Sequence, residues 1–155
     1  MQNRFERFTH AIFEISRYWH KITAAELEHL GLKGTHAIYL TVLSRFPEGL
    51  TAAKLCERAG RDKADVSRAL ADFEQKGLID RQNGYRSLVV LTEAGRHAAE
   101  FVRSRAELAV TVASEGVSAE MRTAMYEALG RIAENLQAIS RDGLPHPNDN
   151  ELILK

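Results

Sequence analysis

The N-terminal part of the chain carries apolar side chains at alternating spacings of three and four. The spacing links six residues: Phe5, Phe8, Ile12, Ile15, Trp19 and Ile22. It places them on one face of an α-helix. Gly31 and Gly34 interrupt the pattern, so a first helix of about six turns is predicted.

Shorter helical patterns follow. Ile38, Val42 and Phe46 recur at a spacing of four, and Pro47 stops that helix near Phe46. Two more helices are expected, each with a polar N-cap and a closing glycine. The caps and glycines are Thr51 with Gly60 and Asp62 with Gly77, and the second of these helices turns Val66, Leu70 and Phe73 inward.

Beyond residue 77 the apolar period changes to two. Two extended runs, 78–82 and 85–91, flank the dipeptide Asn83-Gly84. Asn-Gly between such runs predicts a β-hairpin with a two-residue turn.

The predicted turn fixes which side chains face each other. It pairs Gln82 with Tyr85 and places Arg81 opposite Arg86. Like charges in that position destabilise a hairpin, unless both reach toward an anion such as a phosphate or a narrow minor groove. Two alternatives stay open: the arginines diverge into solvent, or a four-residue loop shifts the pairing.

Two long helices are predicted at the C-terminal end. Thr92 is the expected cap of one, which runs to about Ser114, and Ser118 is the expected cap of the other. The apolar stripe of the last helix consists of Met121, Met125, Ala128, Ile132, Leu136 and Ile139. One small block at residues 35–92 cannot cover the stripes of both terminal arms, so we expect the arms to pack on each other and on a second copy of the chain.

Charge, cysteine content and the absence of long apolar runs limit which classes of function the sequence supports. The 155 residues carry 21 basic and 21 acidic side chains, so net charge gives no argument for nucleic-acid binding. Residues 54–86 are mildly basic, with eight basic and six acidic side chains, whereas residues 107–155 carry four and eight. The single cysteine fits a reducing cytoplasm, and no apolar run or N-terminal leader predicts a membrane or secreted protein.

Residues 52–71 read AAKLCERAGRDKADVSRALA and have the spacing of a helix-turn-helix. Two helices that cross at a tight turn need a small residue where they cross, a residue tolerant of positive φ in the turn, and an apolar residue that packs the second helix against the first. Cys56, Gly60 and Val66 supply these at spacings of four and six. The alternative is a pair of packed helices without a role on DNA.

The second helix of this motif has an outer face lined by alanine. A helical wheel with Val66 inward turns Ala64, Arg68, Ala71 and Gln75 outward, with Ser67 beside them. Arginine can bind guanine through two hydrogen bonds and serine can bind several bases, while Lys63 and the helix N-terminus suit phosphates. The predicted DNA-binding residues are Lys63, Ala64, Ser67, Arg68, Gln75, Arg81 and Arg86.

Residues 50–95 resemble the winged helix-turn-helix of the multiple-antibiotic-resistance regulator (MarR) family. The resemblance rests on DK-x-x-V-S-R-x-L, on E-x-K-G-L-I-x-R and on LTEAG. It implies a mainly α fold with a two-stranded hairpin wing, and a homodimer that reads a pseudo-palindromic operator as a ligand-responsive repressor. Arg86 matches the wing arginine of that family, whereas Asn83 and Tyr85 replace its usual acidic and basic neighbours.

The resemblance also divides the chain and implies an effector site. The predicted parts are an N-terminal dimerisation helix at 1–33, a winged helix-turn-helix region at 34–92 (helix-turn-helix 52–76, wing 78–91), C-terminal dimerisation helices at 93–141 and a tail at 142–155. A small aromatic or other organic effector is expected where the arms meet the winged helix. The predicted lining residues are Arg17, Tyr18, Trp19, His20, His36 and Tyr39.

Other chemistry is weighed against this interpretation. Cys56 could sense peroxide, but its place at the helix crossing favours a small buried side chain. His10 with Glu14, and Glu26 with His29, have metal-ligand spacings, yet a bundle site needs more ligands, so no metal or cofactor is expected. No catalytic motif is present, so no enzyme is predicted. A winged-helix module that binds a protein instead of DNA is the alternative function.

Overall fold

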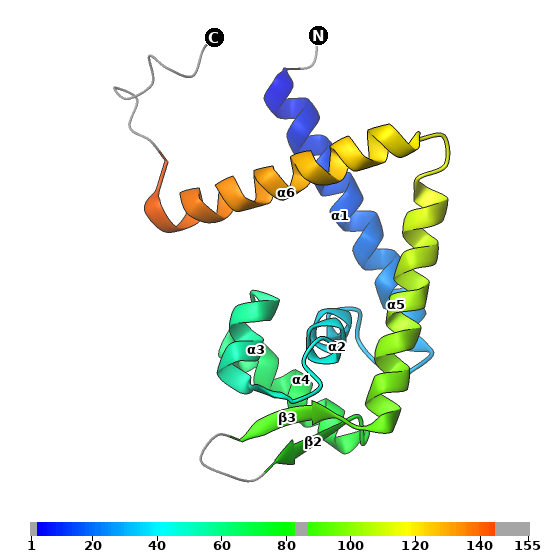
Figure 1. Ribbon diagram of the computed structural model, residues 1–155, viewed down its shortest axis with the longest axis vertical. Coiled ribbons are helices and arrows are strands. Elements are labelled where there is room, and N and C mark those ends of the chain that lie inside the picture. Colours follow the sequence, from blue (N-terminus) through cyan, green and yellow to red (C-terminus); the bar gives the residue numbers. More distant parts are fainter. Residues whose placement is uncertain (1–2, 83–86, 145–155) are drawn as a thin grey trace. The chain divides into compact units, whose positions relative to one another are not determined.

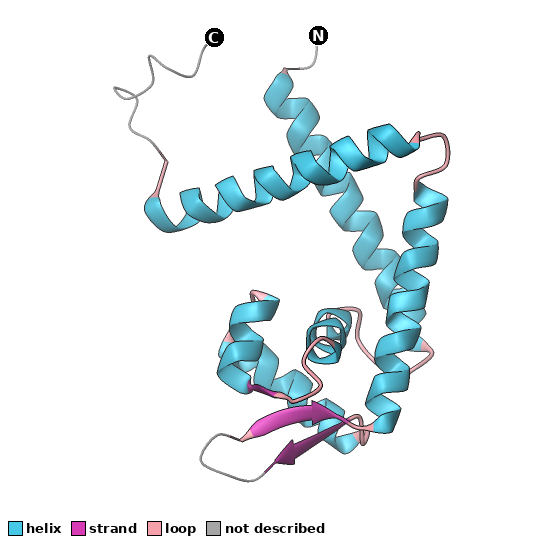
Figure 2. Cartoon of the chain, viewed as in Figure 1, coloured by secondary structure: helices cyan, strands magenta, loops and turns pink. Residues whose placement is uncertain are grey.

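The computed structural model describes residues 3–82 and 87–144. In chain order the elements are α1 (Arg4–Glu28), α2 (His36–Ser44), β1 (Leu50–Thr51), α3 (Ala52–Ala59), α4 (Lys63–Gln75), β2 (Ile79–Gln82), β3 (Leu88–Leu91), α5 (Glu93–Ala113) and α6 (Ala119–Asp142) (Figures 1 and 2). The chain divides between Val110 and Thr111 into two compact units, which are described separately. The order of four helices, a hairpin and two helices confirms the sequence-based prediction.

The helix starts are set by side-chain caps. The predicted caps Thr51, Asp62 and Ser118 each accept a hydrogen bond from the backbone N–H three residues further on, and Thr92 does the same for Gly95 at 3.0 Å. Such caps satisfy backbone donors that have no partner inside the helix. Asn3 caps α1 by accepting the N–H of Phe5, two residues further on, and its own N–H donates to the Glu6 carboxylate as in a capping box; the apolar pattern did not predict this cap.

The turn between α3 and α4 follows the predicted helix-turn-helix. Gly60 closes α3 with φ of 61°, in the left-handed region that glycine adopts without strain. Leu55 of α3 and Val66 of α4 are both almost fully buried. Cys56 is half-buried against this core, in agreement with a small packed side chain at the helix crossing.

The sheet corrects the predicted hairpin. Its strands lie in the order β1, β3, β2, all antiparallel, so a third strand of two residues joins the predicted pair. Gln82 pairs with Leu88 and Arg81 with Val89, so the predicted pairing of Gln82 with Tyr85 and of Arg81 with Arg86 is wrong. The Asn83-Gly84 turn itself, Tyr85 and Arg86 lie outside the described residues.

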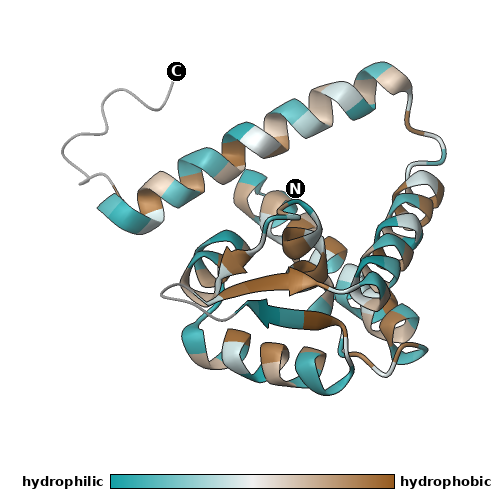
Figure 3. Cartoon of the chain, turned by 60° about the horizontal axis from the view of Figure 1, so that its bottom comes forward, coloured by the Kyte–Doolittle hydropathy of each residue, from teal (hydrophilic) through white to brown (hydrophobic). Residues whose placement is uncertain are grey.

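The observed register follows from burial. Ile79 pairs with Leu91, and both are buried together with Val89. The predicted register would have placed Ile79 opposite Leu88, on the other face of β3 from Val89 and Leu91, because side chains alternate along a strand. Figure 3 shows β3 as apolar throughout, as expected for a strand between a core and a neighbouring strand on each edge.

The core of the N-terminal unit surrounds α2. Tyr39, Leu40 and Leu43 are at most 1% exposed, whereas Ile38 is 37% exposed. The predicted inward set of Ile38, Val42 and Phe46 is therefore only partly correct, since Val42 is buried and Phe46 is half-buried. The reason is that α3, α4 and β3 all contact α2, and a helix enclosed in this way has no single apolar stripe.

The link from α4 through the sheet to α5 depends on one close approach. The Thr92 hydroxyl donates to the Gly77 carbonyl at 2.7 Å, and the Thr92 N–H donates to the Leu78 carbonyl at 3.0 Å. A Cβ atom at Gly95 would lie 1.9 Å from the same Leu78 oxygen. The glycine of the LTEAG motif therefore lets the first turn of α5 pack on the backbone at the start of the wing.

The terminal helices carry large apolar side chains that are exposed in the described part of the chain. On α1, Phe5 is 70% exposed and Ile15 is 64% exposed. On α6, Met121 is 61% exposed and Leu136 is 52% exposed, and no residue of α6 is buried within the described part of the chain. These are the stripes that the sequence pattern identified, and soluble monomers seldom expose contiguous apolar faces of this kind.

Candidate nucleic-acid interface

The outer face of α4 presents the residues that the helical wheel assigned to it. Val66, Ala69, Leu70 and Phe73 are buried. The residues on the opposite side are all exposed: Lys63, Ala64, Ser67, Arg68, Ala71 and Gln75. The predicted orientation of this helix is thereby confirmed, whereas the contacts of its side chains with DNA stay a prediction.

Arg68 is the most prominent polar group on this face. Its side chain is 70% exposed, and its Nη2 donates to Asp65 Oδ1 at 3.3 Å. Ser67 stands beside it with an exposed hydroxyl. The alanines at 64 and 71 leave room around the guanidinium, so a flat partner such as a base-pair edge can approach it closely.

The cationic residues at the edge of the face have different surroundings. Lys63 opens α4 next to the cap Asp62, where backbone N–H groups and the helix dipole favour an anion. Arg81 on β2 donates from Nε to Glu74 Oε1 at 2.8 Å, so a phosphate would have to replace that carboxylate. Arg86 lies outside the described residues.

Two partly exposed aspartates of α4 contact α2. Asp65 accepts the Tyr39 hydroxyl at 3.0 Å, and the hydrogen bond from Tyr39 with that from Arg68 lowers the pKa of this carboxyl. Burial and the contact with Asp65 raise the pKa of Tyr39 to about 12. Asp72 lies 3.6 Å from the buried His36 ring and 2.6 Å from Lys76 Nζ, and burial lowers the pKa of His36.

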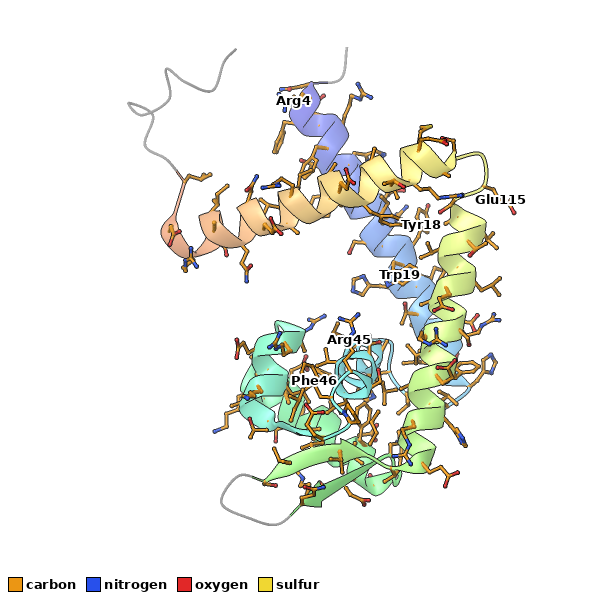
Figure 4. All side chains as sticks on the ribbon, in the orientation of Figure 1. Arg4, Tyr18, Trp19, Arg45, Phe46 and Glu115 are labelled. Carbon is orange, nitrogen blue, oxygen red and sulfur yellow. The ribbon has the colours of Figure 1, made fainter. Side chains whose placement is uncertain are left out.

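A cavity of about 330 Å³ lies in the N-terminal unit between α1, α2 and α5, and it reaches the turn after α3. Most of its wall is apolar, with Trp19, Ile22, Ile38, Val102 and Ala106 among the lining residues. Trp19 lines the cavity from α1, whereas its neighbour Tyr18 does not; both side chains are labelled in Figure 4. A volume of this size matches the lower end of small-molecule sites.

The predicted effector residues divide into three groups. Trp19 and His20 line the cavity. Arg17 and Tyr18 are exposed and hydrogen-bonded to each other at 2.8 Å, outside the cavity lining. His36 and Tyr39 are buried and contact α4 instead.

The charged groups of the cavity were not predicted as part of it. Arg105 of α5 binds Glu26 of α1 through two hydrogen bonds of 2.6 and 3.0 Å, which lowers the pKa of Glu26. Arg61, in the turn after α3, lines the same cavity. Glu26 follows Ile22 by four residues and Arg105 follows Val102 by three, so each is a charge on an apolar helix face, and that signal could have identified both.

No helix within residues 3–82 and 87–144 is long and apolar enough to cross a membrane. Glu26, which the sequence offered as a metal ligand, has its carboxylate engaged by Arg105. The helix-turn-helix, the three-stranded wing sheet and the exposed face of α4 together define a winged-helix protein.

Comparisons with known proteins agree with this class. Residues 30–84 match the MarR family. A curated relative from Bacillus subtilis, the HTH-type transcriptional regulator YdgJ, is 28% identical over 113 residues, which span 70% of this chain and 68% of the relative. A MarR transcriptional regulator from Methanosarcina mazei has the same fold, with a TM-score of 0.80, 21% identity and coverage of 90% of this chain and 94% of that one.

A MarR-family regulator from Listeria monocytogenes, whose structure was solved in complex with a 26mer DNA, also shares the fold. Its TM-score is 0.74 at 24% identity, and the match covers 94% of this chain and 99% of the Listeria chain. The match over residues 30–84 and the relatives found make the chain similar to MarR-family transcriptional regulators. The resemblance drawn from its motifs is confirmed, and the family consists of regulators and not of enzymes.

Proposed function

We propose that the chain is a sequence-specific DNA-binding repressor that binds a pseudo-palindromic operator as a homodimer. The observation that carries the proposal is the exposed face of α4, where Arg68 and Ser67 stand between small alanines. The Listeria relative that shares this fold was solved with DNA, which supports the same partner here. With genomic DNA as the proposed partner, we also propose a cytoplasmic location.

The proposed contacts divide into base readout and anchoring. Arg68, Ser67 and Gln75 read base edges in the major groove, and Ala64 permits the close approach. Lys63 and the N-terminus of α4 bind phosphates. Arg81 and Arg86 bind the backbone or a narrow minor groove beside the wing.

The homodimer is proposed from the exposed stripes of α1 and α6. Each carries large apolar side chains that are exposed in the described part of the chain, such as Phe5 at 70% and Met121 at 61%. A second copy with the same stripes supplies a matching surface, as a two-fold symmetric interface requires. Two winged helices in such a dimer match the two halves of a palindromic site.

The test of base readout is Arg68→Ala. This change should cost about 1–3 kcal/mol on the cognate duplex and much less on a scrambled one, because a lost base contact matters only where the base is present. Binding to both duplexes across a salt series measures it. Arg86→Ala is the contrasting variant and should weaken both duplexes by similar factors, with a salt slope shallower by about one.

Equal losses on both duplexes in Arg68→Ala would show that α4 does not read bases through this face. An intact chain without salt-dependent affinity for any duplex would favour the alternative, a winged-helix module that binds a protein.

We further propose that the cavity beside Trp19 holds a small aromatic effector with a carboxylate. Apolar walls favour an aromatic ring, and the guanidinium of Arg61 favours an anion, whereas Arg105 is paired with Glu26 in the same wall. Occupants of this cavity would contact both α2 and the turn that leads into α4, which makes the repressor responsive to the ligand.

Trp19 is the only tryptophan of the chain and reports on the cavity directly. Titration with benzoate should change its fluorescence saturably, and Arg61→Met should weaken benzoate binding by about tenfold or more, since a hydrogen bond to a charged group is lost. Neutral benzamide serves as the control ligand, because Arg61→Met should leave its affinity unchanged. A flat titration with benzoate up to millimolar concentration would contradict an aromatic acid at this site.

A further inference from the structure

Asp65 joins a buried tyrosine of α2 to the exposed arginine of the recognition face. Its Oδ2 accepts the hydroxyl of Tyr39 at 3.0 Å, and its Oδ1 accepts from Arg68 Nη2 at 3.3 Å. The backbone N–H of Asp65 donates to Asp62 Oδ1 at 2.8 Å. Both carboxylate oxygens and the backbone of this one residue are therefore held.

Tyr39 is a rigid anchor for this arrangement. The residue is 1% exposed, in the core of the N-terminal unit, and its hydroxyl donates to Asp65 of α4. A buried hydroxyl without a partner is costly, so the Tyr39–Asp65 hydrogen bond serves the core as well. The carboxylate of Asp65 is thus fixed from inside the protein, 26 residues away in sequence.

We propose that Tyr39 and Asp65 are positioning residues for base recognition: Tyr39 fixes the carboxylate of Asp65, and this carboxylate orients the guanidinium of Arg68 toward the base pairs. The inference rests on the proposed contact of Arg68 with bases. Arginine has five N–H donors, and guanine uses two, so the bond to Asp65 leaves donors for the base. Because the guanidinium of Arg68 is already ordered by Asp65, it loses less conformational entropy on binding DNA.

A different role of Asp65 predicts the opposite result. If the carboxylate only offsets the positive charge of α4, its removal should tighten binding to every duplex alike. If it orients Arg68, removal should reduce the preference for the cognate duplex over a scrambled one. The ratio of the two dissociation constants separates these roles.

Asp72 provides a matched control on the same helix. Its side chain is 30% exposed against 35% for Asp65. It also faces a buried residue of α2, His36, and pairs with a basic residue four positions on, Lys76. Asp72→Asn therefore removes the same charge and disturbs the same pair of helices without touching Arg68.

The experiment uses the full-length chain and a duplex that it enriches from a randomised pool. Dissociation constants for this duplex and a scrambled one are measured for Tyr39→Phe, Asp65→Asn and Asp72→Asn, each with Arg68 and with Arg68→Ala. Tyr39→Phe and Asp65→Asn should lower the cognate-to-scrambled preference about three- to tenfold, the range for loss of one hydrogen bond. Asp72→Asn should leave the preference unchanged.

In the Arg68→Ala background, Tyr39→Phe should cause no further loss of preference, because its effect passes through the guanidinium. An unchanged preference in Tyr39→Phe, or an equal loss in both backgrounds, would overturn the inference. Tyr39→Phe removes only one oxygen and changes no charge. If Asp65→Asn does not fold, Tyr39→Phe alone therefore tests the inference. A wild-type chain that enriches no sequence would defeat the proposed function itself, which is a different result.

Discussion

Gly95→Ala should destabilise the N-terminal unit by about 3 kcal/mol, at the upper end of the cost of overpacking. The added Cβ would lie 1.9 Å from the Leu78 carbonyl oxygen and 3.1 Å from a methyl group of Leu91. The backbone at Leu78 cannot move away from the new methyl group as easily as a flexible side chain could. The Leu78 carbonyl also accepts the N–H of Thr92, so moving it away would break a hydrogen bond at the junction of wing and helix.

Urea unfolding of the variant and the wild type measures this loss of stability. The matched control is Gly130→Ala, which lies within α6, where an added Cβ meets nothing within 4 Å of its own chain. Its position is on the side of α6 opposite the stripe of Met121 and Met125. Alanine there should be neutral or stabilising by up to about 1 kcal/mol. Equal stability of Gly95→Ala and the wild type would contradict the proposed role of this close approach.

The helix boundaries could be predicted because local chemistry sets them. Thr51, Asp62, Thr92 and Ser118 all cap helices as their residue types suggested, since a cap needs only the side chain and the next three residues. The helix-turn-helix was accessible for the same reason. The geometry of two crossing helices fixes the spacing of the small residue, the turn glycine and the apolar packing residue.

The hairpin register could not be predicted from the turn residues. Asn83-Gly84 favours a two-residue turn, but the paired positions Gln82 and Leu88 stand further apart than that turn allows. Burial of Ile79 opposite Leu91 decided the register. The pairing of β1 with β3 was also missed, because two residues give no recognisable period.

The sequence predicted the exposed face of the candidate site but not the side-chain contacts that lie behind it. The exposed face of α4 follows from the helical wheel, which needs only one helix. The Glu26–Arg105 ion pair joins residues 79 positions apart, and the Tyr39–Asp65 bond joins α2 to α4. Tertiary partners of this kind are not visible in local patterns, and so Tyr39 was assigned to an effector site and not to the recognition helix.

Removal of residues 117–155 should abolish dimerisation and lower operator affinity by about 100-fold or more. Large apolar side chains of the α6 stripe are exposed in the described part of the chain, with Met121 at 61% and Leu136 at 52%. A second copy is the partner we expect for it. A monomer engages one half-site, and it loses the gain in effective concentration that comes from linking two.

Sedimentation and DNA binding measured on the same samples test this expectation. The shortened chain should remain folded, because the core residues from Leu27 to Val102 all precede the cut. Deletion of residues 144–155, the part of the predicted tail (142–155) that follows α6 and its cap Gly143, is the control and should leave both oligomeric state and affinity as in the intact chain. An intact chain that sediments at the monomer mass of 17.4 kDa would contradict the dimer. If the shortened chain instead bound the operator as tightly as the intact one, a single winged helix would suffice, and α6 would need another role.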